Sequence, residues 1–332
     1  MMNSKTTIVT VTYGNRLDYL EQLVERSLAY PQIDHVIVVS NASTAPLETL
    51  TQRWPTGVTI IRLDANTGSA NGYAVAIEAA LKTDAQYLWM MDDDNAPTPS
   101  AIEHLYAQLA QRGAHHGLDK VAVLGFRPTQ QADIASGVPH RYATQLPSSY
   151  FGFHVMQLPY KLWRRMPWGK PKGKPEPLVS VPFAPYGGML AHRSLYERIG
   201  LPLRELVLYV DDTEYTRRIT AMGGHLYVVT DALIEELEHS WNIKERTSNI
   251  YETFLLGGSD FRAYYTARNQ AWFDKNVWAA SPLMYRINRG VFHYLLAHFA
   301  RKSNTASRFE MIRSAITEGE TGALGINKSF PL

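Results

Sequence analysis

Three consecutive carboxylates are the feature of this 332-residue chain that most clearly indicates chemistry. Asp92, Asp93 and Asp94 directly follow an apolar run at residues 87–91 (YLWMM). Carboxylates this close repel one another, so the cluster is costly unless a cation binds to it. Hard divalent ions such as Mg²⁺ and Mn²⁺ prefer oxygen ligands and commonly bridge a carboxylate to phosphate oxygens. The triplet therefore predicts a metal and nucleotide site, and the alternative is a solvated acidic turn before Pro97.

A second acidic cluster lies more than a hundred residues further along the chain. Asp211, Asp212 and Glu214 follow the apolar residues 206–210 and precede a helical pattern over 213–222. Mutual repulsion raises the pKa of one such carboxylate toward a value useful for a general base, whose help is typically worth about 10²–10⁴-fold in rate. The alternative is that one of the two aspartates caps the helix, which leaves the other unexplained.

The elements that must position these side chains are strands and helices in alternation. Helical patterns over residues 17–28 and 73–81 separate apolar, β-branched runs. These runs are residues 7–13, 35–40, 58–63 and 87–91. Near-continuous apolar strands alternating with helices predict an α/β fold with a Rossmann-like, mostly parallel sheet flanked by helices. Right-handed crossovers place the loops after the strands along one edge of that sheet.

Polar residues lie at the end of, or soon after, each of the first three predicted strands. They are Thr12, Asn15 and Arg16, then Asn41, then Asp64 and Asn66. We expect these side chains to converge with the aspartate triplet on one ligand. Residues 66–72 (NTGSANG) open a helix with small residues that let backbone N–H groups approach a bound molecule. Their spacing matches neither a dinucleotide fingerprint nor a Walker A loop.

Taken in order, these motifs resemble the inverting glycosyltransferases of family 2, which have the GT-A fold. The motifs are TVTYGNR at 10–16, the asparagine-containing loop at 66–72, MDDDN at 91–95, YVDDTEY at 209–215 and EHSWN at 238–242. The chain is most similar to bacterial galactofuranosyltransferases and related rhamnosyltransferases in MDDD, in GLP at 200–202, in DDTEY and in YYTARN at 264–269. The resemblance covers residues 7 to 272, and the order of its motifs is more specific than any one of them.

The resemblance implies a role for each carboxylate. Asp92 and Asp94 are expected to bind Mn²⁺ or Mg²⁺, and His239 to complete the metal shell; the alternative for His239 is an ordinary histidine near a strand end. Asp212 matches the family's base, with Asp211 and Glu214 on acceptor hydroxyls. Residues expected to contact the donor nucleotide or its sugar are Thr12, Arg16, Asn41, Asp64, Asn66, Asp93 and Arg268.

The function implied is a metal-dependent inverting transfer of galactofuranose from UDP-galactofuranose to a cell-surface glycan such as an O-antigen or capsule. One alternative is a rhamnosyltransferase that uses dTDP-rhamnose. Another, of a different class, is a catalytically silent nucleotide-sugar-binding module of a glycan-synthesis complex. Nearby tryptophans usual in galactofuranosyltransferases are absent around residues 183–190 (FAPYGGML), which leaves the donor sugar open.

Composition fits a globular enzyme. Apolar residues make up 45% of the chain and charged residues 19%, enough for a sizeable core. With 33 basic and 31 acidic residues the net charge is +2, so no nucleic-acid partner is predicted. Cysteine is absent, and neither an apolar leader nor an apolar stretch of about 18 residues occurs. We expect a cytoplasmic protein.

Two segments suggest further partners. Residues 160–174 carry six basic residues and two tryptophans with no acidic residue, which suits an anionic membrane surface or a lipid-diphosphate-linked acceptor; the alternative is a solvated basic loop. Residues 282–302 form an amphipathic helical pattern. That helix is expected to pack on its own protein or in a homo-oligomer, with a peripheral place on the inner membrane as the alternative.

The predicted organisation is a GT-A domain at residues 1–250 followed by a helical C-terminal region at 251–332. Within the GT-A domain, residues 1–125 are expected to form the nucleotide-sugar half and residues 126–250 the acceptor half.

Overall fold

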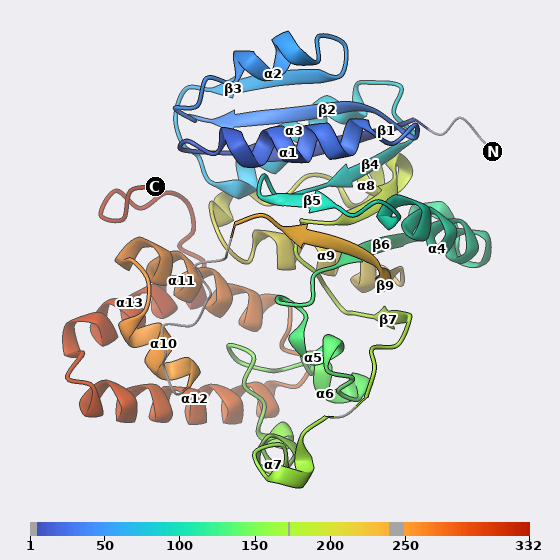
Figure 1. Cartoon of the computed structure of the whole chain (residues 1–332). Coiled ribbons are helices and arrows are strands. Elements are labelled where there is room, and N and C mark those ends of the chain that lie inside the picture. Colours follow the sequence, from blue (N-terminus) through green and yellow to red (C-terminus); the bar gives the residue numbers. More distant parts are fainter. Residues whose placement is uncertain (1–4, 172, 239–248) are drawn as a thin grey trace. The chain divides into compact units, whose positions relative to one another are not determined.

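The computed structural model describes residues 5–171, 173–238 and 249–332, and the chain divides into two compact units (Figure 1). The sheet unit comprises Met1–Ala135, Pro175–Arg204 and Asp211–His239. The helical unit comprises Ser136–Lys174, Glu205–Val210 and Ser240–Leu332. This division differs from the predicted boundary at residue 250, because residues 136–174 and 205–210 pack with the C-terminal helices instead of with the sheet.

Nine strands of the described residues form one mixed sheet. They are β1 (Thr6–Thr12), β2 (Ile33–Asn41), β3 (Val58–Leu63), β4 (Tyr87–Met90), β5 (Asn95–Pro97), β6 (Val121–Phe126), β7 (Leu178–Ser180), β8 (Met189–His192) and β9 (His225–Glu236). Their order is β3-β2-β1-β4-β8-β6-β9-β5, with β7 also paired to β9.

The first four strands are parallel, as their apolar, β-branched sequences predict. Ile8 pairs with Val36 on one side and with Trp89 on the other, and Val36 pairs in turn with Val58. Strand β8 then runs antiparallel between β4 and β6. Two reversals of direction make β6 point the same way as β4, so both strands end at the same edge of the sheet.

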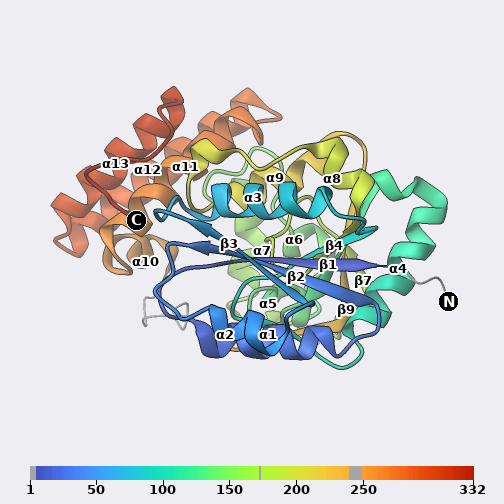
Figure 2. The same cartoon turned by 90° about the horizontal axis from the view of Figure 1, so that it is seen from above.

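Helices cover both faces of this sheet. The α-helices of the sheet unit are α1 (Leu17–Leu28), α2 (Glu48–Arg53), α3 (Ser69–Leu81), α4 (Ala101–His116), α5 (Ala132–Ala135), α8 (Arg193–Ile199) and α9 (Asp211–Ala221). Figure 2 shows α1 and α2 on one face and α3, α8 and α9 on the other. Leu20 and Leu23 of α1 pack with Trp89 of β4 and Leu105 of α4 in one buried core. Both faces are therefore buried, which explains why the strands lack polar alternation.

The helical unit is built from short helices and a C-terminal bundle. Its α-helices are α6 (His140–Ala143), α7 (Leu158–Trp163), α10 (Ile250–Leu256), α11 (Asp260–Asn276), α12 (Pro282–Lys302) and α13 (Ala306–Thr321). Tyr150 and Phe151 pack with Tyr265, Phe292 and Ile312 in a second buried core. The segment 136–174 therefore supplies part of the core that the C-terminal helices close.

Helix α12 shows how the 282–302 pattern is used. Its buried residues Asn288, Phe292, Leu296 and Ala300 recur every four positions and face the unit's own core, as the preferred interpretation predicted. None of the helices in the described part of the chain is both long and apolar enough to cross a bilayer.

Candidate active site

The aspartate triplet lies in a tight turn between two strands of the sheet unit. Strand β4 ends at Met90, the amide of Asn95 donates to the carbonyl of Asp92 at 3.1 Å, and β5 begins at Asn95. The carboxyl end of a parallel strand thus presents all three side chains at the edge that the sequence predicted.

Arg16, which directly precedes α1, binds this turn. Its Nε donates to Asp93 at 3.0 Å, and its Nη2 donates to Asp94 at 2.9 Å and to Glu238 at 2.8 Å. Burial raises the pKa of Asp93 to about 7, although the charge of Arg16 opposes the shift. The hydroxyl of Thr12 is buried beside Asp93. Arg16 was predicted to contact the donor, and in this conformation its guanidinium neutralises the carboxylates.

Asp92 is held by two residues that the sequence analysis did not identify. The Nη1 atom of Arg127 donates to Asp92 at 2.8 Å and to Asn95 at 3.0 Å, and the hydroxyl of Tyr73 donates to Asp92 at 3.1 Å. Arg127 directly follows β6, which ends at the same sheet edge as β4. Arg127, like the aspartates, therefore lies at the carboxyl end of a strand. Its position could not be predicted, because the direction of β6 depends on β8, which lies between β4 and β6 and is distant in the sequence.

Gly187 brings the backbone against the same carboxylate. A Cβ atom placed on Gly187 would lie 2.2 Å from Asp92 Oδ2 and 2.7 Å from Asn95 Oδ1. Neither atom can move away freely, because both accept hydrogen bonds from Arg127. The backbone at Gly187 therefore approaches Asp92 more closely than any residue with a side chain could.

The second acidic cluster occupies the first turn of α9. Asp211 is buried and accepts a hydrogen bond from Ser69 Oγ at 2.9 Å, and half-buried Asp212 accepts one from the Thr213 amide at 2.6 Å. Burial raises the pKa of both carboxyl groups, and the negative charge of Asp92 raises that of Asp212 further. Helix α9 begins at Asp211, two residues earlier than the pattern indicated, so both aspartates lie within its first turn.

The two acidic clusters therefore lie together in the sheet unit. Asp92 and Arg127 are both close enough to shift the pKa of Asp212, in opposite directions. The rings of Tyr73 and Tyr186 contact each other between the clusters, with centroids 4.2 Å apart and planes inclined at 41°. Burial raises the pKa of Tyr186, and the negative charges of Asp211 and Asp212 raise it further. Tyr186 was not among the predicted site residues.

Glu214 has a different environment from the predicted acceptor contact. Its carboxylate forms a two-bond ion pair with Arg218, at 2.8 and 2.6 Å, one turn along α9. Arg218 also donates to the carbonyls of Ile199 and Leu201. Glu214 therefore holds the arginine that connects α9 to the end of α8, and its role on the acceptor stays a prediction.

Asn41 and Asn66, both predicted to contact the donor nucleotide or its sugar, connect two loops by hydrogen bonds. The side chain of Asn41 donates to Asn66 at 2.7 Å and accepts from the Thr67 amide at 2.8 Å, while Asn66 accepts from the Gly68 amide. These bonds shape the loop that opens α3. Asp64, after β3, is exposed.

Arg268 does not reach solvent. It is buried in the helical unit, where its guanidinium donates to the carbonyls of Leu206 and Gly325 and to Asn269 Oδ1. Asn269 in turn donates to the carbonyls of Leu206, Leu208 and Tyr209. The predicted phosphate contact is therefore corrected: Arg268 and Asn269 fix a backbone segment in which Tyr209 and Val210 adopt positive φ angles of 65°.

The metal prediction rests on a donor set that is partly described. Asp92 and Asp94 are 34% and 25% exposed at their side chains, so their oxygens can accept a further partner. Carboxylate oxygens at a strand end suit Mg²⁺ and Mn²⁺. His239, the third predicted ligand, lies outside the described residues, and within those residues no three metal-ligating side chains gather closely enough to hold an ion.

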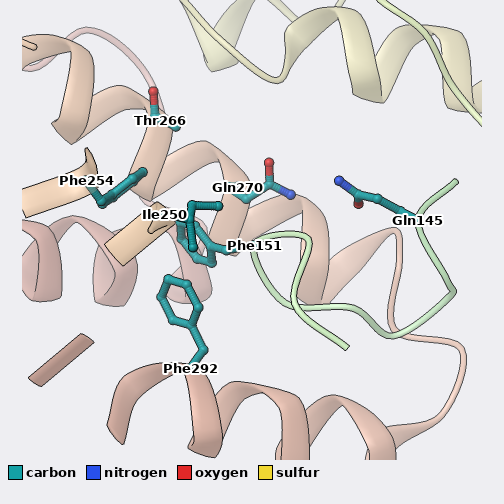
Figure 3. Close-up of a pocket in the computed structure, with 7 residues that line it drawn as sticks. All are labelled: Gln145, Phe151, Ile250, Phe254, Thr266, Gln270 and Phe292. Atoms are coloured by element: carbon teal, nitrogen blue, oxygen red, sulfur yellow. The ribbon is translucent and has the colours of Figure 1, made fainter. Parts of the chain in front are cut away.

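A pocket of about 160 Å³ in the helical unit is a separate feature (Figure 3). Three phenylalanines and an isoleucine are grouped in its wall, with Thr266 close to Phe254 and the two glutamine side chains on the other side. Its residues are Gln145, Phe151, Ile250, Phe254, Thr266, Gln270 and Phe292. None of the predicted site residues lines it.

Comparison with known proteins identifies the family of this chain. The model of the family described as "Glycosyl transferase family 2" matches residues 7–200, which is more than half of the chain. The chain therefore belongs to glycosyl transferase family 2, and it is a glycosyltransferase with the GT-A fold. No curated protein matches its sequence.

Solved structures resemble the chain at low identity. GalNAc-T7, crystallised with UDP, GalNAc and Mn²⁺, is 12% identical with a TM-score of 0.53 over 86% of this chain and 54% of its own. The chain thus spans about half of that protein. S. aureus TarS 1-349 in complex with UDP is 14% identical (TM-score 0.49; 96% and 92% covered). The Pyrobaculum calidifontis mannosyltransferase PcManGT, with GDP-Man and Mn²⁺, is 16% identical (TM-score 0.48; 95% and 86% covered). At 12% identity, the likeness to GalNAc-T7 concerns the fold alone.

Proposed function

We propose that this glycosyltransferase transfers a sugar from a nucleoside diphosphate donor to a hydroxyl acceptor, with inversion and with the help of Mn²⁺ or Mg²⁺. The observation that carries the proposal is the meeting of two acidic clusters in the sheet unit, with Asp92 close enough to Asp212 to raise its pKa. One cluster supplies metal-binding oxygens and the other a base, which are the two requirements of this transfer.

In the proposed reaction, Asp212 takes the proton from the acceptor hydroxyl. The hydroxyl oxygen forms a bond to the anomeric carbon while the bond from that carbon to the diphosphate oxygen breaks, and the electron pair leaves with the diphosphate. A divalent ion held by Asp92, Asp94 and His239 would supply positive charge for that leaving group. Ser69 and Thr213 hold Asp211 and Asp212 in place, and Arg127 and Tyr73 orient Asp92.

For the donor we propose UDP-galactofuranose and for the acceptor a growing cell-surface glycan, on the basis of the MDDD, GLP, DDTEY and YYTARN motifs. The test is a panel of nucleotide sugars, including dTDP-rhamnose, incubated with synthetic acceptors and Mn²⁺ and analysed by NMR. Transfer from UDP-galactofuranose with an inverted anomeric centre supports the proposal. Transfer from dTDP-rhamnose alone would replace the donor. No turnover with any donor, together with no metal-dependent nucleotide binding, would favour a silent module.

The metal assignment has its own test. Asp94→Ala removes one proposed ligand oxygen pair, so we expect nucleotide affinity in the presence of Mn²⁺ to fall by about tenfold or more. Isothermal titration calorimetry with UDP, with Mn²⁺ and then with a chelator, measures this. If the chelator leaves the UDP affinity of the wild type unchanged, nucleotide binding does not depend on the metal. If Asp94→Ala binds UDP with Mn²⁺ as tightly as the wild type, Asp94 is not a metal ligand.

A further inference from the structure

Part of the helical unit exposes a group of large apolar side chains. Leu162 and Trp168 are 56% and 68% exposed, and Trp163 and Met166 are also exposed. We call the exposed side chains of residues 161–170 the α7 surface. Figure 1 shows α7 at the tip of the loop-rich part of this unit. Clustered exposed hydrophobic residues on a folded protein indicate an interaction site.

The α7 surface is held in shape and is more than a solvated loop. Tyr160 of α7 stacks on Tyr142 of α6 with ring centroids 3.7 Å apart and planes 4° from parallel. The chain then turns sharply: the Met166 amide donates to the Trp163 carbonyl, and the Gly169 amide donates to the Met166 carbonyl, both at 3.0 Å. The unit therefore maintains an arrangement that leaves tryptophan and leucine in water, which is unfavourable without a partner.

Charge indicates what kind of partner covers these side chains. Residues 160–174 include no acidic residue, and basic side chains alternate with the apolar ones at Lys161, Arg165 and Lys170. Tryptophan is favoured at the boundary between lipid headgroups and acyl chains. Each lysine or arginine close to an anionic membrane also strengthens binding to it. A partner protein with a surface of mixed charge would not favour a segment whose charged residues are all basic.

We propose that the α7 surface docks the protein on an anionic lipid bilayer, with Leu162, Trp163, Met166 and Trp168 entering the headgroup region and Arg165 and Lys170 on lipid phosphates. The proposal places the enzyme at the surface where a lipid-linked glycan would be found. It stands independently of which sugar is transferred.

The test is cosedimentation of the full-length protein with vesicles of phosphatidylcholine, with and without phosphatidylglycerol. We expect binding to the anionic vesicles that weakens as salt is raised, because screening reduces the charge contribution. The variant Leu162→Ser/Trp168→Ser should bind at least about tenfold more weakly, from loss of buried apolar area. Arg165→Glu/Lys170→Glu changes no apolar side chain and should also lose binding to the anionic vesicles.

The matched control is Leu283→Ser/Tyr294→Ser on α12, whose side chains are 69% and 72% exposed. It removes as much exposed apolar surface from a different site and should bind vesicles like the wild type. The proposal is overturned if the wild type ignores anionic vesicles at low salt, if the α7 variants bind normally, or if the control loses binding equally. Sedimentation velocity tests whether a second copy of the chain covers the α7 surface instead. If the α7 variants lose self-association but keep vesicle binding, the surface is a contact between copies and the proposal is overturned.

Discussion

At the residue scale, the candidate site contains carboxylates that keep accessible oxygens beside side chains whose polar atoms are fully engaged by the protein. Asp92, Asp94 and half-buried Asp212 have oxygens that remain accessible. The carboxylate of Glu214 is engaged by Arg218, and the guanidinium of Arg268 is engaged by backbone carbonyls. The residue type alone could not distinguish these cases, because the partners and the burial of each side chain depend on segments that are distant in the sequence.

Asp212→Asn tests the base. The asparagine oxygen can still accept from the Thr213 amide, so α9 should start as in the wild type. Transfer should fall by about 10²-fold or more while the dissociation constant for the donor stays within a factor of two or three, as expected when a positioned base is lost. Steady-state kinetics and titration calorimetry measure the two quantities. Near-normal turnover would assign the base to another group.

At the scale of elements, local sequence patterns predicted the strands and helices of the first part of the sheet unit. The strands near 7–13, 35–40 and 58–63 and the helix at 17–28 are confirmed, because buried parallel strands and an amphipathic helix each leave a pattern within about ten residues. The direction of β6, and with it the position of Arg127, could not be predicted in this way. It depends on β8, which pairs with β4 across about a hundred residues.

Gly187→Ala tests the contact between one loop and the turn after β4. The added methyl group would displace Asp92 or Asn95, both of which Arg127 holds, so we expect loss of metal-dependent nucleotide affinity and at least about tenfold lower transfer. Calorimetry with UDP and Mn²⁺, together with kinetics, provides the measurement.

Gly290→Ala is the matched control for that substitution. Gly290 lies within α12, and a Cβ there meets nothing within 4 Å. Replacing an interior helical glycine should raise the free energy of unfolding by about 0.5–1 kcal/mol without changing transfer. A Gly187→Ala enzyme that binds nucleotide and turns over normally would show that the turn adapts freely.

At the scale of the whole molecule, the pH dependence of stability has a buried carboxyl group as one source. Burial raises the pKa of Asp274 to about 7, against the opposing hydrogen bonds from the Phe151 amide and Gln270. The unfolded chain has an ordinary aspartate pKa near 4. Between pH 4 and 7 the folded state therefore binds more protons than the unfolded state, and its stability decreases as the pH rises through this window.

Asp274→Asn removes that titration. Asparagine can accept from the Phe151 amide and donate to Gln270 after its amide rotates, so the buried bonds are preserved. The variant should match the wild type at about pH 4 and below, and should exceed it in stability by a growing amount as the pH rises to about 7. Chemical denaturation across this range is the measurement, and a wild-type advantage that persists at pH 8 would contradict the proposed cause.

The two compact units exchange the polypeptide several times: each is assembled from three separate stretches, and residues 136–174 and 205–210 cross into the unit that the C-terminal helices close. Neither unit can be excised or grafted as a single cassette. A truncation after residue 250 would remove the helices that bury Tyr150 and Phe151. The shortened chain would therefore expose aromatic side chains to solvent. Chimeras between relatives of this chain therefore require paired junctions near 135 and 175, near 204 and 211, and near 239.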